Sequence, residues 1–137
     1  MPTPDAVLLD THALIWWQAR STRLSAPARR AIESARNVLV SPISCWEVAM
    51  LVAKGRIALD RPVDAWCNDL FDGDGPVGIA ELTPSVAVAA GQIQDLPGDP
   101  ADRLIYATAR SASIPLITKD PLLRNAAKAD KQVVALW

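Results

Sequence analysis

Short, wholly apolar runs alternate with longer amphipathic segments along this 137-residue chain, and this alternation constrains the fold more than any other feature. A strand that is apolar on both faces must be covered on both faces, which is typical of a parallel sheet connected through helices. The strongest candidate strands are residues 6–9, 37–40 and 115–117, and the weaker ones are 77–82 and 132–135. Because such crossovers are right-handed, the pattern predicts a three-layer α/β/α sandwich around a mostly parallel sheet.

The intervening segments carry signals for helix starts. A capping Ser, Thr or Asp followed within two residues by Pro predicts helices beginning near residues 25, 83, 99 and 120, the second reaching 93 and the third about 113. Residues 62–71 show the clearest amphipathic spacing, and helices are also expected over 11–19 and 43–53. There is no internal repeat and no linker, so we expect a single domain over residues 1–137.

Composition excludes several classes of protein. Half of the residues are hydrophobic and 21% are charged, which excludes a disordered chain. The net charge of −1 argues against binding nucleic acid through bulk electrostatics, and no apolar run approaches the length of a membrane span. Cys45 and Cys67 form no metal or redox motif, so we expect reduced core thiols in a cytoplasmic protein. His12 is the single histidine, which excludes cleavage of RNA by a pair of histidines.

Two of the strongest candidate strands lead into acids. Asp10 directly follows residues 6–9, and Asp120 follows 115–117 after Thr118 and Lys119. Function in open parallel sheets gathers at the carboxyl ends of the strands, where the strand order reverses. If these two strands are neighbours, both carboxylates project into one crevice. Each acid is also a good helix N-cap, and a cap can serve as a metal ligand at the same time.

Two further acids lie in helical segments. Glu47 occurs in the most apolar helix, where an ionised carboxylate costs on the order of several kcal/mol unless it meets a cation or hydrogen-bond donors. An arginine partner or a raised pKa is the alternative to a ligand role. Asp102 follows the expected cap Asp99 by three residues, where the helix dipole alone would favour it.

Four like charges converging on one crevice are stable only around a cation. With no Cys or His cluster, oxygen ligands select Mg²⁺ or Mn²⁺. The hydroxyls of Thr11 and Thr118 are suited to orient the ligands from behind.

The sequence resembles PIN-domain ribonucleases of the VapC type, the toxins of bacterial toxin–antitoxin pairs. Four segments carry the resemblance, in order and over almost the whole chain: LLDTHALIWW at 8–17, SPISCWEVA at 41–49, DPADRLIYATA at 99–109 and PLITKD at 115–120.

This resemblance implies a catalytic quartet that binds divalent metal, made of Asp10, Glu47, Asp102 and Asp120. The 18-residue interval from Asp102 to Asp120 matches the family better than the 21 residues from Asp99, which we interpret as a cap or accessory residue. Thr11 and Thr118 match polar positions that support such a site.

The resemblance also implies an activity. One or two Mg²⁺ or Mn²⁺ ions would activate water for in-line attack on single-stranded RNA, leaving a 5′-phosphate and a 3′-hydroxyl. Arg103 and Lys119 are candidate phosphate contacts, followed by Arg20 or Arg23, although each could be an ordinary solvated charge. Nothing in residues 60–78 indicates which RNA is the target.

Expected partners are a second copy of the chain and a small antitoxin, which inserts a segment into the acidic groove of a heterotetramer or larger complex. Trp16 and Trp17 are adjacent and cannot share one helix face. We expect one in the core and the other at such an interface, with RNA stacking less favoured.

Two alternatives remain open. A receiver-type phosphoacceptor domain would need adjacent acids after the first strand, but Thr11 follows Asp10. It would also need an Asp ending a central strand, and the segment from Glu81 to Pro84 offers none. A PIN-like binding module that has lost catalysis is the second alternative, against which the intact quartet argues.

Overall fold

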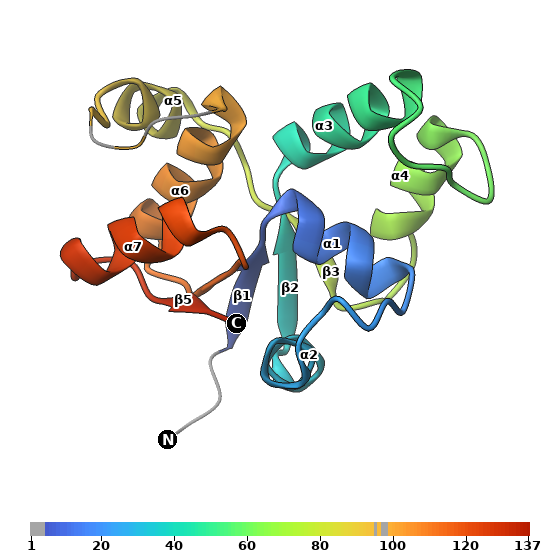
Figure 1. Ribbon diagram of the computed structural model, residues 1–137, viewed down its shortest axis with the longest axis horizontal. Coiled ribbons are helices and arrows are strands. Elements are labelled where there is room, and N and C mark those ends of the chain that lie inside the picture. Colours follow the sequence, from blue (N-terminus) through green and yellow to red (C-terminus); the bar gives the residue numbers. More distant parts are fainter. Residues whose placement is uncertain (1–4, 95, 97–98) are drawn as a thin grey trace.

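The computed structural model describes residues 5–94, 96 and 99–137 (Figure 1). Within these residues a five-stranded, all-parallel sheet has the order β3-β2-β1-β4-β5. The strands are β1 (Ala6–Leu9), β2 (Asn37–Val40), β3 (Val77–Ile79), β4 (Leu116–Ile117) and β5 (Ala135–Leu136). The helices are α1 (Thr11–Gln18), α2 (Ala26–Ser34), α3 (Pro42–Ala53), α4 (Val63–Phe71), α5 (Pro84–Gly91), α6 (Pro100–Ala112) and α7 (Pro121–Ala129).

The central strand β1 pairs with β2 on one side and with β4 on the other, so the strand order reverses beside it. Leu9 is in register with Val40 of β2 and with Ile117 of β4. The predicted neighbouring of the first and fourth strands is therefore confirmed. The carboxyl ends of all three strands meet at one edge of the sheet.

Helices cover both faces of the sheet, as the apolar strands require (Figure 1). Val7 and Leu9 pack with α1 to α4 in one core cluster, whereas Leu8 packs with α6 and α7 in another. This alternation follows from the two-residue period of a strand. Helix α5 lies against α6, where Val86 contacts Ala107 in a small third cluster. The predicted three-layer α/β/α sandwich is confirmed.

Side chains cap six of the described helices, five of them at residues that the sequence signals predict, whereas the cap Ser41 was not predicted. Each capping oxygen accepts a hydrogen bond from a backbone N–H in the first helical turn, which satisfies a donor that has no partner within the helix. The caps are Asp10, Ser25, Ser41, Thr83, Asp99 and Asp120.

Several predicted boundaries differ from the structure. The strand expected over 77–82 ends at Ile79, and the one expected over 132–135 is instead Ala135–Leu136. The last strand shifts because its residues pair with Leu116 and Ile117 of β4. The helix expected to reach 93 ends at Gly91.

The predictions for tryptophan and cysteine placement are corrected. Trp16 and Trp17 are both half-buried against the same core cluster, so neither is the fully buried core residue that we expected one of them to be. Cys45 and Cys67 are free thiols as expected, but they too are only half-buried. No helix among the described residues is long and apolar enough to cross a membrane.

Candidate active site

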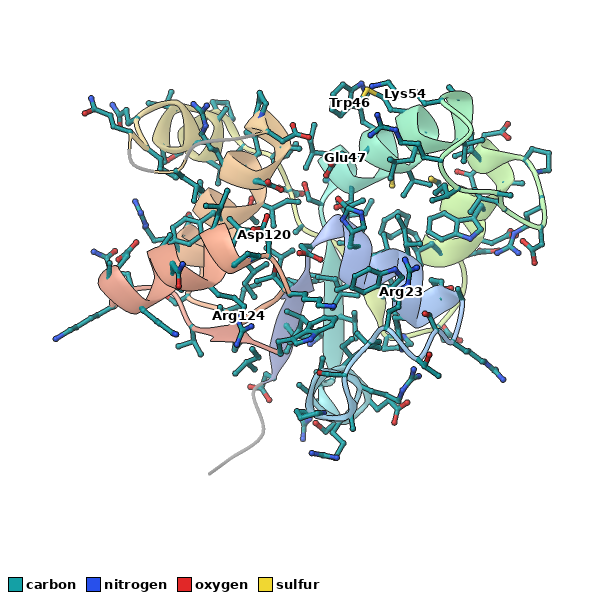
Figure 2. The ribbon with its side chains drawn as sticks, viewed as in Figure 1. Arg23, Trp46, Glu47, Lys54, Asp120 and Arg124 are labelled. Atoms are coloured by element: carbon teal, nitrogen blue, oxygen red, sulfur yellow. The ribbon has the colours of Figure 1, made fainter. Side chains whose placement is uncertain are left out.

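A cavity of about 510 Å³ opens at the carboxyl ends of β1 and β4. In Figure 2, Glu47 comes from α3, Asp120 directly precedes α7 in the opposite layer, and Arg23 comes from the segment between α1 and α2. Five of the eleven residues that line the cavity are acids: Asp10, Glu47, Asp99, Asp102 and Asp120. The structure thus brings together the whole quartet and the accessory acid that the sequence predicts.

Asp10 holds a fixed position at the inner end of the cavity. Its Oδ1 accepts a hydrogen bond from the backbone N–H of Ala13 at 2.8 Å, and its Oδ2 accepts one from the hydroxyl of Thr118. The register that pairs Leu9 with Ile117 places Asp10 beside Thr118, one residue beyond each strand. Burial raises the pKa of Asp10, although these hydrogen bonds oppose the shift.

The hydroxyl of Thr118 connects two of the acids. While donating to Asp10, it accepts a hydrogen bond from the backbone N–H of Asp120 at 3.0 Å. Asp120 in turn caps α7, since its Oδ1 accepts from the backbone N–H of Leu122 at 2.9 Å. Thr118 is fully buried, so water does not compete for these contacts.

Thr11 serves Glu47 in a similar way. Its Oγ1 donates to Glu47 Oε1 at 2.5 Å and lies 3.0 Å from the hydroxyl of buried Ser44. Helices α1 and α3 start from neighbouring strands, which explains why Thr11 in the first turn of one reaches the second turn of the other. The alternative of an arginine partner for Glu47 is not seen among the described ion pairs. Burial raises the pKa of Glu47.

The pKa of Asp102 reflects the negative charge of the site. It lies in the first turn of α6, three residues after the cap Asp99, whose Oδ1 accepts from the backbone N–H of Ala101 at 3.1 Å. Burial, followed by the negative charges of Asp120, Glu47, Asp99 and Asp10, raises the pKa of Asp102 to about 7. The repulsion predicted from the sequence is therefore present in the folded chain.

The cations of the cavity only partly match the candidate phosphate contacts. Lys119 and Arg23 line the cavity, whereas Arg103 and Arg20 are not among its lining residues. His12 and Trp16 also line the cavity. We expected no role in the site for His12, and for Trp16 we favoured the core or a protein interface over RNA stacking. Their spacing of four residues on α1, starting two residues after Asp10, is a signal that could have placed them on one helix face.

The chemistry of the lining fits a hard divalent cation. All five acids offer oxygen atoms, neither cysteine lines the cavity, and the raised pKa of Asp102 marks negative charge that a cation would neutralise. Among the described residues, no three Asp, Glu, His or Cys side chains are grouped closely enough to form a ready-made metal site. The acids share a cavity without converging on a point.

A larger cavity, about 800 Å³, lies between α5, α6 and α7. Three of its polar lining residues form a network, in which Arg110 forms an ion pair with Asp130 at 2.7 Å and Tyr106 donates to the same carboxylate at 3.2 Å. The charge of Asp130 is therefore balanced by Arg110, unlike the five acids of the smaller cavity.

Comparison with known proteins identifies the family. The PIN domain family model matches residues 7–129. The chain is 48% identical to Ribonuclease VapC22 of Mycobacterium tuberculosis over 120 residues, which cover 87% of this chain and 90% of that protein.

Two solved structures share the fold. One is VapBC2 from Rickettsia felis, solved bound to a DNA fragment from its promoter. It matches with a TM-score of 0.63 at 14% identity, covering 95% of this chain and 96% of that one. FitAcB from Neisseria gonorrhoeae matches with a TM-score of 0.60 at 22% identity, covering 94% and 95%. The family model spans most of the chain, and the VapC22 identity extends over nearly all of both proteins. The chain therefore belongs to the PIN-domain family, as a VapC-type ribonuclease toxin.

Proposed function

We propose that this protein is a Mg²⁺- or Mn²⁺-dependent endoribonuclease that cleaves single-stranded segments of RNA, and that it does so in the cytoplasm as one half of a toxin–antitoxin pair. One observation carries the proposal: five carboxylates from four different segments line one cavity at the carboxyl ends of the central strands. A chain gains no stability from gathering so much negative charge, and burial together with the charges of the neighbouring acids raises the pKa of Asp102 to about 7.

Asp10, Glu47, Asp102 and Asp120 would hold one or two ions, their side chains turning inward from the walls of the shared cavity. When bound, the metal supplies an activated water and neutralises charge on the scissile phosphate. Two hydroxyls limit how far the ligands must move: Thr118 holds Asp10, and Thr11 holds Glu47. Asp99 caps α6 and adds negative charge beside Asp102.

Lys119 and Arg23 are placed to bind the RNA backbone. Both line the cavity that contains the acids, and neither forms an ion pair among the described residues. Positive side chains beside a metal cluster bind the phosphates that flank the one being cleaved. Arg103 lies outside this lining, so we assign it no contact with RNA.

We infer two protein partners, a small cognate antitoxin and a second copy of this chain. The Rickettsia felis VapBC2 and Neisseria FitAcB structures, which share this fold over nearly the whole chain, support the antitoxin. We extend the domain, matched over residues 7–129, to all 137 residues because Leu136 of the last strand pairs with Ile117 in the sheet.

The experiment that tests the function compares cleavage of single-stranded RNA by wild type, Asp10→Asn and Glu47→Gln. Wild type should cleave with Mg²⁺ or Mn²⁺ and stop on addition of EDTA. Each variant should lose at least roughly 100-fold in rate, since it removes a charged ligand while retaining the shape and most hydrogen bonds of the side chain. Sequencing the RNA ends after controlled expression identifies the target.

Circular dichroism and thermal melting provide the control, since both variants should remain folded. A variant that cleaves at the wild-type rate would remove that residue from the quartet. A folded wild type that binds RNA and Mg²⁺ but leaves the RNA intact would instead favour the binding module without catalysis.

A further inference from the structure

One wall of the acidic cavity is aromatic and positively charged. Trp16 lines the cavity, and its ring centroid lies 5.6 Å from that of His12 and 5.8 Å from that of Trp137. The Trp137 ring meets it edge-on, at 62° between the planes, and the His12 ring is tilted at 53°. One of these contacts comes from the first turn of α1, the helix that carries Trp16, and the other from the last residue of the chain, and together they hold the indole at the edge of the site.

A cation lies over the face of this indole. Lys119 Nζ is 5.8 Å from the centre of the Trp16 ring, within the range of a cation–π contact. Lys119 is exposed and directly precedes the quartet acid Asp120. Two adjacent residues therefore supply a proposed metal ligand and the cation that lies over the ring. Arg23 adds a second positive charge to the cavity lining.

We infer that Trp16 is a base-stacking platform for the nucleotide next to the cleaved bond, with Lys119 and Arg23 binding the phosphates on its two sides. This inference rests on the proposed ribonuclease function and adds a positioning residue to it. Every nucleobase has a π-face, so such a platform holds a strand without reading its sequence through hydrogen bonds.

The lining chemistry favours a nucleotide over a peptide at this wall. Each nucleotide of an RNA strand carries a planar base and an anionic phosphate on the same ribose. This pairing matches an indole that lies beside two cations. A divalent cation bound by the acids across the cavity would then lie between their carboxylates and the RNA phosphate. It would offset the repulsion between these negative charges. A peptide presents a ring and an anion together only where an aromatic residue lies beside an acidic one, whereas every nucleotide carries both.

The test measures binding of two labelled 20-mer strands, oligoadenylate and the same ribose-phosphate backbone without bases, with Ca²⁺ in place of Mg²⁺. Wild type should bind the strand with bases roughly tenfold more tightly than the abasic one. Trp16→Leu should bind both strands equally, and Trp16→Phe should restore most of the preference. Lys119→Ala should weaken both strands alike and reduce the salt dependence.

Two other tryptophans provide matched controls. Trp17→Leu removes a half-buried ring from the same helix, and Trp46→Leu removes a half-exposed ring from α3, seen in Figure 2; neither lines the cavity. Both should retain the preference for bases. If Trp16→Leu does not fold, the Trp16→Phe variant still tests stacking, because phenylalanine retains an aromatic ring at this position.

An unchanged preference in Trp16→Leu, or an equal loss in Trp17→Leu, would overturn the inference. If wild type cleaves RNA with Mg²⁺ while Trp16→Leu retains the preference, only the platform fails and the ribonuclease remains. If Trp16→Leu instead loses only its co-expressed protein partner, the ring belongs to a protein interface and the platform is refuted. If wild type binds neither strand and cleaves no RNA, both proposals fail.

Discussion

At the scale of single residues, buried hydroxyls organise the acids of the site. Thr118 donates to Asp10 and accepts from the backbone N–H of Asp120, so one oxygen atom fixes the relative positions of two proposed ligands. Thr11 fixes Glu47 in the same manner. The acids themselves are held apart by their charge, and the hydroxyls limit where each one can go.

Thr118→Val tests this organisation. The valine retains the volume but leaves Asp10 Oδ2 and the N–H of Asp120 without their partner, so we expect RNA cleavage or Mg²⁺ affinity to fall by roughly 10- to 100-fold. Metal titration by calorimetry and a cleavage assay measure the two quantities. Thr118→Ser should retain most of both.

Thr108→Val is the matched control for that substitution. Thr108 is also buried, and its hydroxyl donates to the carbonyl of Leu104 within α6, away from the cavity lining. It should leave Mg²⁺ affinity unchanged. Equal losses in the two valine variants would mean that Thr118 supports the fold and not the ligands.

At the scale of the elements, the helix starts bring the acids to one place. Helices α1, α3 and α7 follow parallel strands, and α6 runs back toward the start of β4, so all four begin at the same edge of the sheet. The positive ends of their dipoles then point at the carboxylates and partly offset the charge. An N-cap and a metal ligand are therefore the same residue at Asp10 and Asp120 in our proposal.

Two substitutions at Asp99 distinguish its role as the cap of α6 from the effect of its negative charge on Asp102. Asp99→Ala removes the oxygen that accepts from Ala101, so we expect the free energy of unfolding to fall by about 0.5–2 kcal/mol. Asp99→Asn retains an oxygen acceptor and should cost little, while it relieves repulsion on Asp102. Urea denaturation without metal compares the two. If Asn and Ala destabilise equally, capping is not what Asp99 contributes to α6.

At the scale of the whole molecule, a net charge of −1 conceals an uneven distribution. Five of the 15 acids line one cavity, so the near-neutral total says nothing about the field that an approaching ion or RNA meets there. Deprotonation of the acids in this cavity adds negative charge, which lowers the free energy of unfolding. A bound cation neutralises that charge, so the stability of the fold and the binding of ions are coupled.

This coupling predicts how stability depends on pH. The pKa of Asp102 is about 7 in the folded chain and near the ordinary value of 3.8 when unfolded, so the folded state binds more protons between these values. Without metal, this contribution should therefore be greatest below pH 4 and be lost as the pH rises through 7. The raised pKa values of Asp10 and Glu47 act in the same direction.

Urea denaturation at pH 5 and pH 8 measures the effect, with EDTA and with Mg²⁺. Asp102→Asn should reduce the loss of stability between the two pH values, and Mg²⁺ should stabilise wild type most at pH 8. If the variant loses as much stability as wild type, then Asp102 does not titrate in this range.

The sequence alone predicts the layers and most of the helix starts, because both depend on local rules. Apolar runs such as residues 6–9 require cover on both faces, and caps such as Ser25 act within one helical turn. It also predicts candidate acids, since Glu47 in an apolar helix is unusual without a partner and Asp10 follows a strand, where it is also a good helix N-cap. The resemblance to PIN-domain ribonucleases selects Asp102 over Asp99 as a ligand.

Only the tertiary structure decided which side chains meet. The strand order puts Asp10 beside Thr118, 108 residues away, and the same packing brings Lys119 over the ring of Trp16 while leaving Arg103 outside the cavity. It also made both Trp16 and Trp17 half-buried, against the prediction. The physical reason is that local patterns fix the period and ends of an element, whereas contacts between distant side chains depend on the register and packing of the whole sheet.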